Sequence, residues 1–139
     1  MPAGPEAWWA DAKKELLSAQ TLKRNGHARQ AYHHAGQAVE FGLKAIYMRR
    51  RGLSDWPGDL RGAPWHDLQR IADAAGLGAD VAKLGKPRYG NWLTVRDWKS
   101  NARFPGNAPS TRDLNDLYLA VSHERDGVMG WLESIFHNS

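Results

Sequence analysis

The chain has 139 residues, which is the length of one ordinary domain with enough material to bury a core. A hydrophobic fraction of 42% and a net charge of only +4 exclude an intrinsically disordered chain. No stretch approaches the roughly 18 consecutive apolar residues of a membrane span. Cysteine is absent, which excludes disulfides and thiolate chemistry. Together with an N-terminus that lacks an export signal, this predicts a cytoplasmic protein without membrane association.

Helical periodicity dominates the chain and predicts an all-α fold in one domain over residues 1–139. In chain order, helices are expected at about residues 5–24, 27–51, 65–75, 92 to 102 or 103, and 110–136, with a further turn at 80–84. Asn91 is the expected N-cap of the fourth helix, and Ser110 opens the fifth with a capping box. In the second helix, Gly36 and Gly42 each cost up to ~1 kcal/mol relative to alanine. We therefore expect close packing of a neighbouring helix to require both glycines.

Polar residues line one face of the second helix, opposite its apolar stripe. His33, Gln37, Glu40 and Lys44 follow one another at i, i+4, i+7 and i+11. Glu40 and Lys44 also have the favourable orientation for an i, i+4 ion pair. The pattern has two readings, a solvated surface or a polar groove or dimer face.

Basic residues recur in the fourth helix, where Arg96, Lys99 and Arg103 are spaced i, i+3 and i+7. Guanidinium groups match the geometry of phosphate, and a neighbouring indole such as Trp98 stacks on bases. The alternative is that these cations pair with carboxylates of the last helix. The candidates for such pairs are Asp113, Asp116 and Glu124.

His66 and Asp67 follow Pro64 and are expected to open the third helix. Asp67 in a first helical turn interacts favourably with the helix dipole. His66 has a second reading, as a polar contact that projects toward the second helix. His33 and His34 are adjacent and diverge on a helix, so the sequence predicts no metal site.

Three short elements resemble a known family. They are Tyr32…Gln37-Ala-Val-Glu40…Leu43-Lys-Ala45, His66-Asp-Leu68 and Ala102-Arg-Phe-Pro105. In this order they resemble the HEPN domain, an all-α module of prokaryotic nucleotide-linked and RNA-targeting systems. The resemblance runs from the first helix to Phe136. It implies an antiparallel up-and-down bundle of four to five helices that pairs into a homodimer.

The ribonuclease branch of the family carries an Arg followed, after four to six residues, by a His. Downstream of Arg96 or Arg103 no His occurs before His123. Arg29 and His34 match the spacing, but they lie early in the second helix, whereas the family's motif lies in the later half of the bundle. We interpret this match as a coincidence and expect no standard ribonuclease activity.

The resemblance and the basic residues together predict a nucleotide- or RNA-binding module, or a partner of a nucleotidyltransferase in a toxin–antitoxin or defence-type system, with no cofactor. The expected phosphate ligands are Lys44, Arg96, Lys99, Asn101 and Arg103. Trp98 or Tyr89 is expected to stack on a base, and the candidate polar groove comprises His33, Gln37, Glu40 and His66. Two alternatives stay open. One is a metal-independent ribonuclease with an unconventional site, such as His33 or His34 with Arg96, and the other is a structural dimerisation module whose contact patch uses Trp8 and Trp9.

Overall fold

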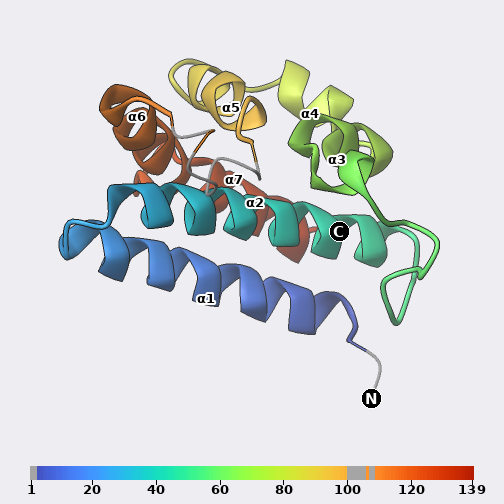
Figure 1. The fold of residues 1–139 in the computed structure, drawn as a ribbon. Helices are drawn as coiled ribbons and strands as arrows, with labels where there is room; N and C mark the ends of the chain where they lie inside the picture. The colour runs from blue at the N-terminus through green and yellow to red at the C-terminus, as the bar shows by residue number, and fades with distance from the viewer. Residues whose placement is uncertain (1–2, 100–105, 107–108) are drawn as a thin grey trace.

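A computed structural model describes residues 3–99, 106 and 109–139. Every regular element in these residues is helical, which confirms the predicted all-α fold class (Figure 1). The order of the elements is α1 (Pro5–Arg24), α2 (Ala28–Arg50), the 3-10 helix η1 (Ala63–His66), α3 (Leu68–Ala74), α4 (Gly78–Ala82), α5 (Arg88–Arg96), α6 (Thr111–Ser122) and α7 (Val128–His137). No described helix combines the length and the apolar character that crossing a bilayer requires.

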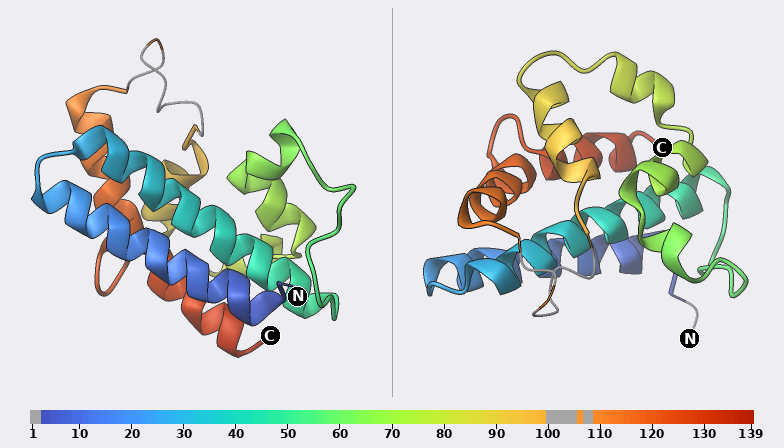
Figure 2. Two further views of the ribbon diagram at one scale, coloured as in Figure 1. Left: turned by 60° about the horizontal axis from the view of Figure 1, so that its bottom comes forward. Right: turned by 45° about the horizontal axis from the view of Figure 1, so that its top comes forward.

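The central element is α2. It lies antiparallel to α1 along its length, α3 and α6 pack against its opposite side, and α7 packs against both α2 and α1 (Figures 1 and 2). More than half of its residues are buried, because α1, α3, α6 and α7 all pack against it. Gly26 and Gly52 follow α1 and α2 with φ of +82° and +65°, a conformation that glycine adopts without strain, so both helices end where the sequence predicts.

Two glycines allow close packing on α2, as predicted. A Cβ at Gly42 would lie 3.1 Å from the ring of Trp9 and 3.4 Å from Leu132 of α7. A Cβ at Gly36 would overlap the indole of Trp98, which lies against α2 at this point. At Gly36 the close neighbour is therefore a single side chain that follows α5, and not a neighbouring helix.

The prediction of one continuous helix over residues 110–136 is wrong. Between α6 and α7, Nδ1 of His123 accepts hydrogen bonds from the backbone N–H groups of Arg125 and Asp126, at 3.3 and 3.1 Å. Gly127 then packs so tightly that a Cβ would lie 2.5 Å from the His123 carbonyl oxygen. A turn built on these contacts replaces the helix. The predicted start is confirmed, because the Ser110 side chain accepts a hydrogen bond from the Asp113 N–H at 3.1 Å.

The fourth predicted helix is displaced toward the N-terminus and is shorter among the described residues. Asn91 lies inside α5 and is not its N-cap. Its side chain and that of Arg88 donate hydrogen bonds to carbonyl groups of the turn between α6 and α7, at 2.9 and 2.8 Å. These bonds connect the first turn of α5 to the turn between α6 and α7, a contact that the sequence pattern did not show.

The third predicted helix is divided. Trp65 and His66 belong to η1, and α3 begins one residue after Asp67. Asp67 is the N-cap of α3, where its side chain accepts a hydrogen bond from the Arg70 N–H at 3.2 Å. The expected further turn at residues 80–84 corresponds to α4.

Tryptophans join the N-terminal part of α1 to the rest of the fold. Trp9 is buried and stacks on Phe136 of α7, with ring centroids 5.1 Å apart. Trp8 packs against Phe41 and against Trp56 in the loop after α2. The expectation that Trp8 and Trp9 form an exposed contact patch is therefore wrong, because both rings are used inside the monomer.

Candidate functional site: a pocket between α3 and α5

An open pocket of about 680 Å³ lies between the start of α3 and the end of α5. This volume falls within the range of roughly 300–1,000 Å³ that small-molecule sites occupy. We call it the α3–α5 pocket, and its lining residues are Ala63, His66, Asp67, Gln69, Arg96, Asp97, Trp98 and Lys99. Four of the residues that the sequence singled out, His66, Arg96, Trp98 and Lys99, thus come together at one place.

Two exposed cations supply the positive charge of the pocket. Arg96 is the last residue of α5, and Lys99 follows after the helix has ended, so the predicted helical stripe is wrong for Lys99. Lys99 also lines a neighbouring cavity with Asp113 and Asp116. Among the described residues, neither Arg96 nor Lys99 forms an ion pair with a carboxylate. As far as the described residues are concerned, both cations are therefore free of a carboxylate partner.

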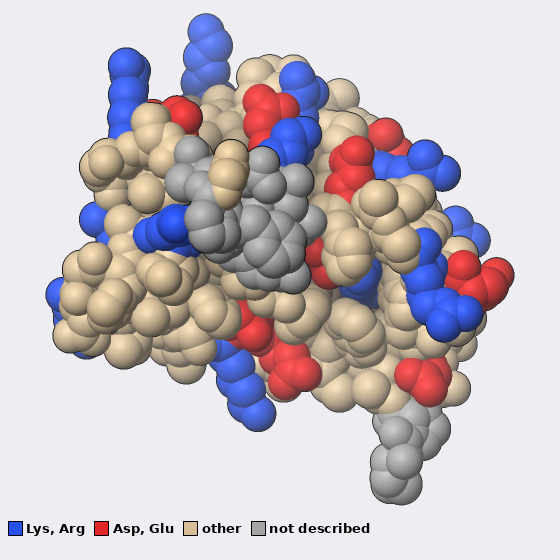
Figure 3. All heavy atoms as spheres, viewed as in Figure 1, with Lys and Arg blue, Asp and Glu red and all other residues tan. Residues whose placement is uncertain are grey.

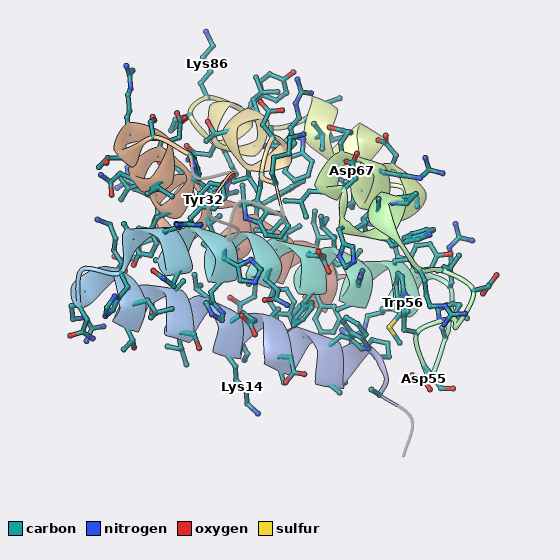
Figure 4. All side chains as sticks on the ribbon, viewed as in Figure 1. Lys14, Tyr32, Asp55, Trp56, Asp67 and Lys86 are labelled. Atoms are coloured by element: carbon teal, nitrogen blue, oxygen red, sulfur yellow. The ribbon has the colours of Figure 1, made fainter. Side chains whose placement is uncertain are left out.

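Acidic residues in the pocket balance these cations. Asp67 and Asp97 line it together with Arg96 and Lys99, and Figure 4 labels Asp67 where α3 begins. On the face drawn in Figure 3, acidic and basic side chains are interspersed and do not form one continuous basic surface. A ligand in this pocket therefore interacts with individual hydrogen-bond donors and not with an extended positively charged surface.

A chain of charged side chains leads from the core to the pocket. Nζ of Lys44 donates a hydrogen bond to Glu40 Oε2 at 3.1 Å, and Glu40 Oε1 lies 3.1 Å from Nδ1 of His66. Glu40 and Lys44 are only 4% and 6% exposed, whereas the His66 side chain is half-exposed. The ion pair and the contact of His66 with α2 agree with the sequence. The reading of this face as a solvated surface is wrong at Glu40 and Lys44.

Aromatic rings explain why a lysine tolerates this burial. Nζ of Lys44 lies 5.0 Å from the ring centroid of Trp56 and 5.6 Å from that of Trp8, distances at which the ring faces attract a cation. Trp56 comes from the loop after α2, and its indole N–H is bound by the carbonyl of Leu60 at 2.9 Å (Figure 4). The loop thus covers Lys44, and this amine has no access to a phosphate ligand in the pocket.

The indole of Trp98 anchors the end of α5 to α2. The ring is 3% exposed, and its N–H donates a hydrogen bond to the Tyr32 carbonyl at 3.2 Å. The Lys99 backbone N–H donates to the Tyr32 hydroxyl at 3.3 Å. Burial raises the pKa of that hydroxyl above its ordinary value of 10.0. The hydrogen bond from Lys99 acts against this rise, and the nearby Asp113 and Asp97 add to it. Trp98 therefore has no exposed face on which a base could stack, contrary to the sequence-based expectation.

The remaining predicted residues lie elsewhere. Tyr89 is exposed on α5, but neither it nor Gln37 lines the α3–α5 pocket. Asn101 and Arg103 lie outside the described residues. His33 lines a separate cavity of about 160 Å³ with Arg29, Gln30 and His34.

The two residues that match the spacing of the ribonuclease motif thus line one small cavity at the start of α2. The ring of His34 is bound there by Glu15 of α1, at 2.5 Å. No group of three His, Asp or Glu side chains suited to a metal ion occurs within the part of the chain that the structure describes.

Sequence reasoning did not identify Gln69 and Asp97 as polar residues of the pocket, and it gave Asp67 only a role at the start of a helix. Gln69 lies one residue into α3 beyond the His66-Asp67-Leu68 element, and Asp97 directly follows Arg96. Both residues lie next to predicted residues in the sequence, and this position is the signal that could have identified them. Only the packing of α3 near α5 shows that the two lie at one pocket.

Comparison with known proteins bears on the N-terminal part of the chain. The family model of the HEPN domain matches residues 5–64, which comprise α1, α2, the following loop and the start of η1. Neither the curated proteins nor the solved structures include a match. The finding confirms the resemblance to the HEPN domain over residues 5–64 and supports a nucleotide- or RNA-related module in general, whereas the elements at residues 66–68 and 102–105 lie outside the match. The homodimer and the nucleotidyltransferase partner stay predictions.

Proposed function

We propose, from the HEPN-domain match of residues 5–64 and the geometry of the α3–α5 pocket, that this protein binds the phosphate groups of a nucleotide or RNA in that pocket. The observation that carries the proposal is the pair of exposed cations, Arg96 and Lys99, without a carboxylate partner among the described residues. They line a pocket of nucleotide size together with the hydrogen-bonding side chains of His66 and Gln69.

The side chains have complementary roles in phosphate binding. The planar guanidinium of Arg96 donates two parallel hydrogen bonds to phosphate oxygens, whereas the Lys99 ammonium acts as a mobile point charge. Gln69 offers an amide N–H group without charge. The pocket has no exposed aromatic ring among its lining residues, because Trp98 is buried. We therefore expect binding that depends strongly on salt and only weakly on base sequence.

The experiment replaces the two cations singly and together. Arg96→Ala and Lys99→Ala should each weaken binding about tenfold or more, since hydrogen bonds to charged groups contribute roughly 1.5–3 kcal/mol. Each should also reduce the slope of log affinity against log salt by about one for RNA. Fluorescence anisotropy with a labelled single-stranded RNA and competition with nucleotides measure both effects.

Matched controls remove the same charges elsewhere. Arg112 is exposed on α6, and Lys14 projects from α1 away from the other helices (Figure 4). Arg112→Ala and Lys14→Ala should leave the affinity within about twofold of the wild type. Equal binding by the wild type and the Arg96→Ala/Lys99→Ala double variant would refute the proposed site.

A further inference from the structure

Among the described residues, His66 is the titratable side chain that joins the buried charges of α2 to the α3–α5 pocket. Its Nδ1 lies 3.1 Å from Oε1 of Glu40, a carboxylate that is only 4% exposed. The ring itself lines the pocket and is half-exposed. The same carboxylate is held on its other oxygen by Lys44. The position of the ring is thus set from inside the fold, and not by solvent.

The hydrogen bond to Glu40 determines which ring nitrogen is left for a ligand. An ionised carboxylate only accepts hydrogen bonds, so Nδ1 of His66 must carry the hydrogen. Nε2 lies on the other edge of the ring, and no described residue binds it. In the neutral ring Nε2 presents a lone pair and repels a phosphate oxygen, whereas in the imidazolium it is a donor.

Among the described residues, the charges of the pocket lining and of the Glu40–Lys44 pair cancel without His66. On the pocket side, Arg96 and Lys99 are offset by Asp67 and Asp97. Behind the ring, Glu40 is offset by Lys44.

The protonation of His66 therefore decides whether the pocket carries a net positive charge. The neutral imidazole leaves the group of surrounding charges balanced, and the imidazolium leaves it at +1. An anionic ligand favours the second state over the first, so binding and proton uptake must be linked.

We propose that phosphate binding in the α3–α5 pocket takes up one proton on His66, whose imidazolium is held at Nδ1 by Glu40 and donates from Nε2 to a phosphate oxygen. This inference rests on the proposed function, which supplies the ligand. The recognised group is a phosphate, carried either as the terminal monophosphate of a nucleotide or as an internal phosphodiester of RNA.

The direction of the pH dependence follows from this linkage. Histidine side chains ordinarily change charge between about pH 5 and 8. If only the protonated state binds, the apparent affinity falls with the protonated fraction, by up to about tenfold per pH unit once the ring is mostly neutral. A phosphodiester keeps one charge throughout this range, so its affinity rises continuously as the pH falls. A terminal monophosphate loses a charge below about pH 6, so its affinity should pass through a maximum.

The test measures affinity between pH 5.5 and 8.5 with two probes, adenosine 5′-monophosphate and a single-stranded RNA with hydroxyl groups at both ends. Calorimetry at pH 7.5 in two buffers of different ionisation heat measures proton uptake. We expect net proton uptake on binding in the wild type and a fall in affinity of at least fivefold from pH 7 to 8.5. The probe that binds with this dependence identifies the source of the phosphate.

Two variants make the result specific. His66→Gln keeps a hydrogen-bond donor without the charge, and it should bind independently of pH above pH 6.5 and without proton uptake. His137 is another exposed histidine, at the end of α7, and His137→Gln should retain the pH dependence of the wild type. Circular dichroism shows that both variants are folded.

The outcomes separate the two proposals. Binding that depends on Arg96 and Lys99 but is independent of pH and takes up no proton overturns the role of His66 alone. An unchanged pH dependence in His66→Gln overturns it as well. Failure of both probes to bind at every pH overturns the proposed function together with this inference.

Discussion

Replacing Gly36 with alanine adds one methyl group at the point where Trp98 lies against α2. A Cβ at this position would overlap the indole, and both residues are buried, so neither can move into solvent without exposing the core. The backbone of α2 is held on its other side by α1. The relaxation that remains is expulsion of the indole, which also breaks the hydrogen bond from Trp98 to the Tyr32 carbonyl.

The expected magnitude is the difference of two terms. Losing a buried tryptophan from its site costs about 3–5 kcal/mol, by analogy with truncation of large core side chains. Alanine in place of glycine within a helix stabilises by about 1 kcal/mol. Gly36→Ala should therefore lower the free energy of unfolding by about 2–4 kcal/mol. Because Trp98 lies between Arg96 and Lys99 in sequence, the variant should also lose ligand binding in the α3–α5 pocket.

Urea denaturation of four proteins tests this reasoning as a double-mutant cycle. In the Trp98→Ala background the indole is gone, so Gly36→Ala should be neutral or stabilising by up to about 1 kcal/mol. Gly130 of α7 is the control, because a Cβ there would meet no atom closer than 4.0 Å, and Gly130→Ala should not destabilise. A wild-type free energy of unfolding in Gly36→Ala would refute the argument, as would an equal loss in both backgrounds.

Two further perturbations test the buried polar groups. Lys44→Met leaves the buried Glu40 carboxylate with His66 as its remaining partner, so it should destabilise by up to about 3–5 kcal/mol. Lys44→Met combined with Glu40→Gln should recover most of this loss in a thermal melt. Equal stability of the single variant and the wild type contradicts the reasoning. Burial raises the pKa of Tyr32 above 10.0 in the folded state, so folding favours the neutral phenol. The resulting contribution to stability is present below pH 10 and is lost as the pH rises through the folded pKa. The urea midpoint should therefore fall less between pH 9 and 11 in Tyr32→Phe than in the wild type, and parallel curves would count against it.

The sequence alone predicted the features that depend on neighbours along the chain. Helical periodicity and the terminating glycines located α1 and α2, because these signals act within a few residues. The same holds for the cap at Ser110, where the bonded N–H lies three residues away. The cost of glycine inside a helix correctly indicated close packing at Gly36, although it did not identify Trp98 as the neighbour.

Where the sequence allowed a side chain to be either exposed or buried, the tertiary structure determined which. Glu40 and Lys44 have the spacing of an exposed ion pair, and only the loop that brings Trp56 over Lys44 makes them buried. The sequence predicted that Trp98 is accessible to a ligand. In the structure α5 ends before Trp98, and the ring packs against Gly36.

The candidate site also depends on the tertiary structure. His66 and Arg96 lie thirty positions apart in the sequence, and no local pattern places them at one pocket. Helical periodicity records which residues share a face of one helix, but it holds no information on which helix covers that face. The pocket is formed by two helix ends, where periodicity stops, and for this reason only the packed structure brings its charges together.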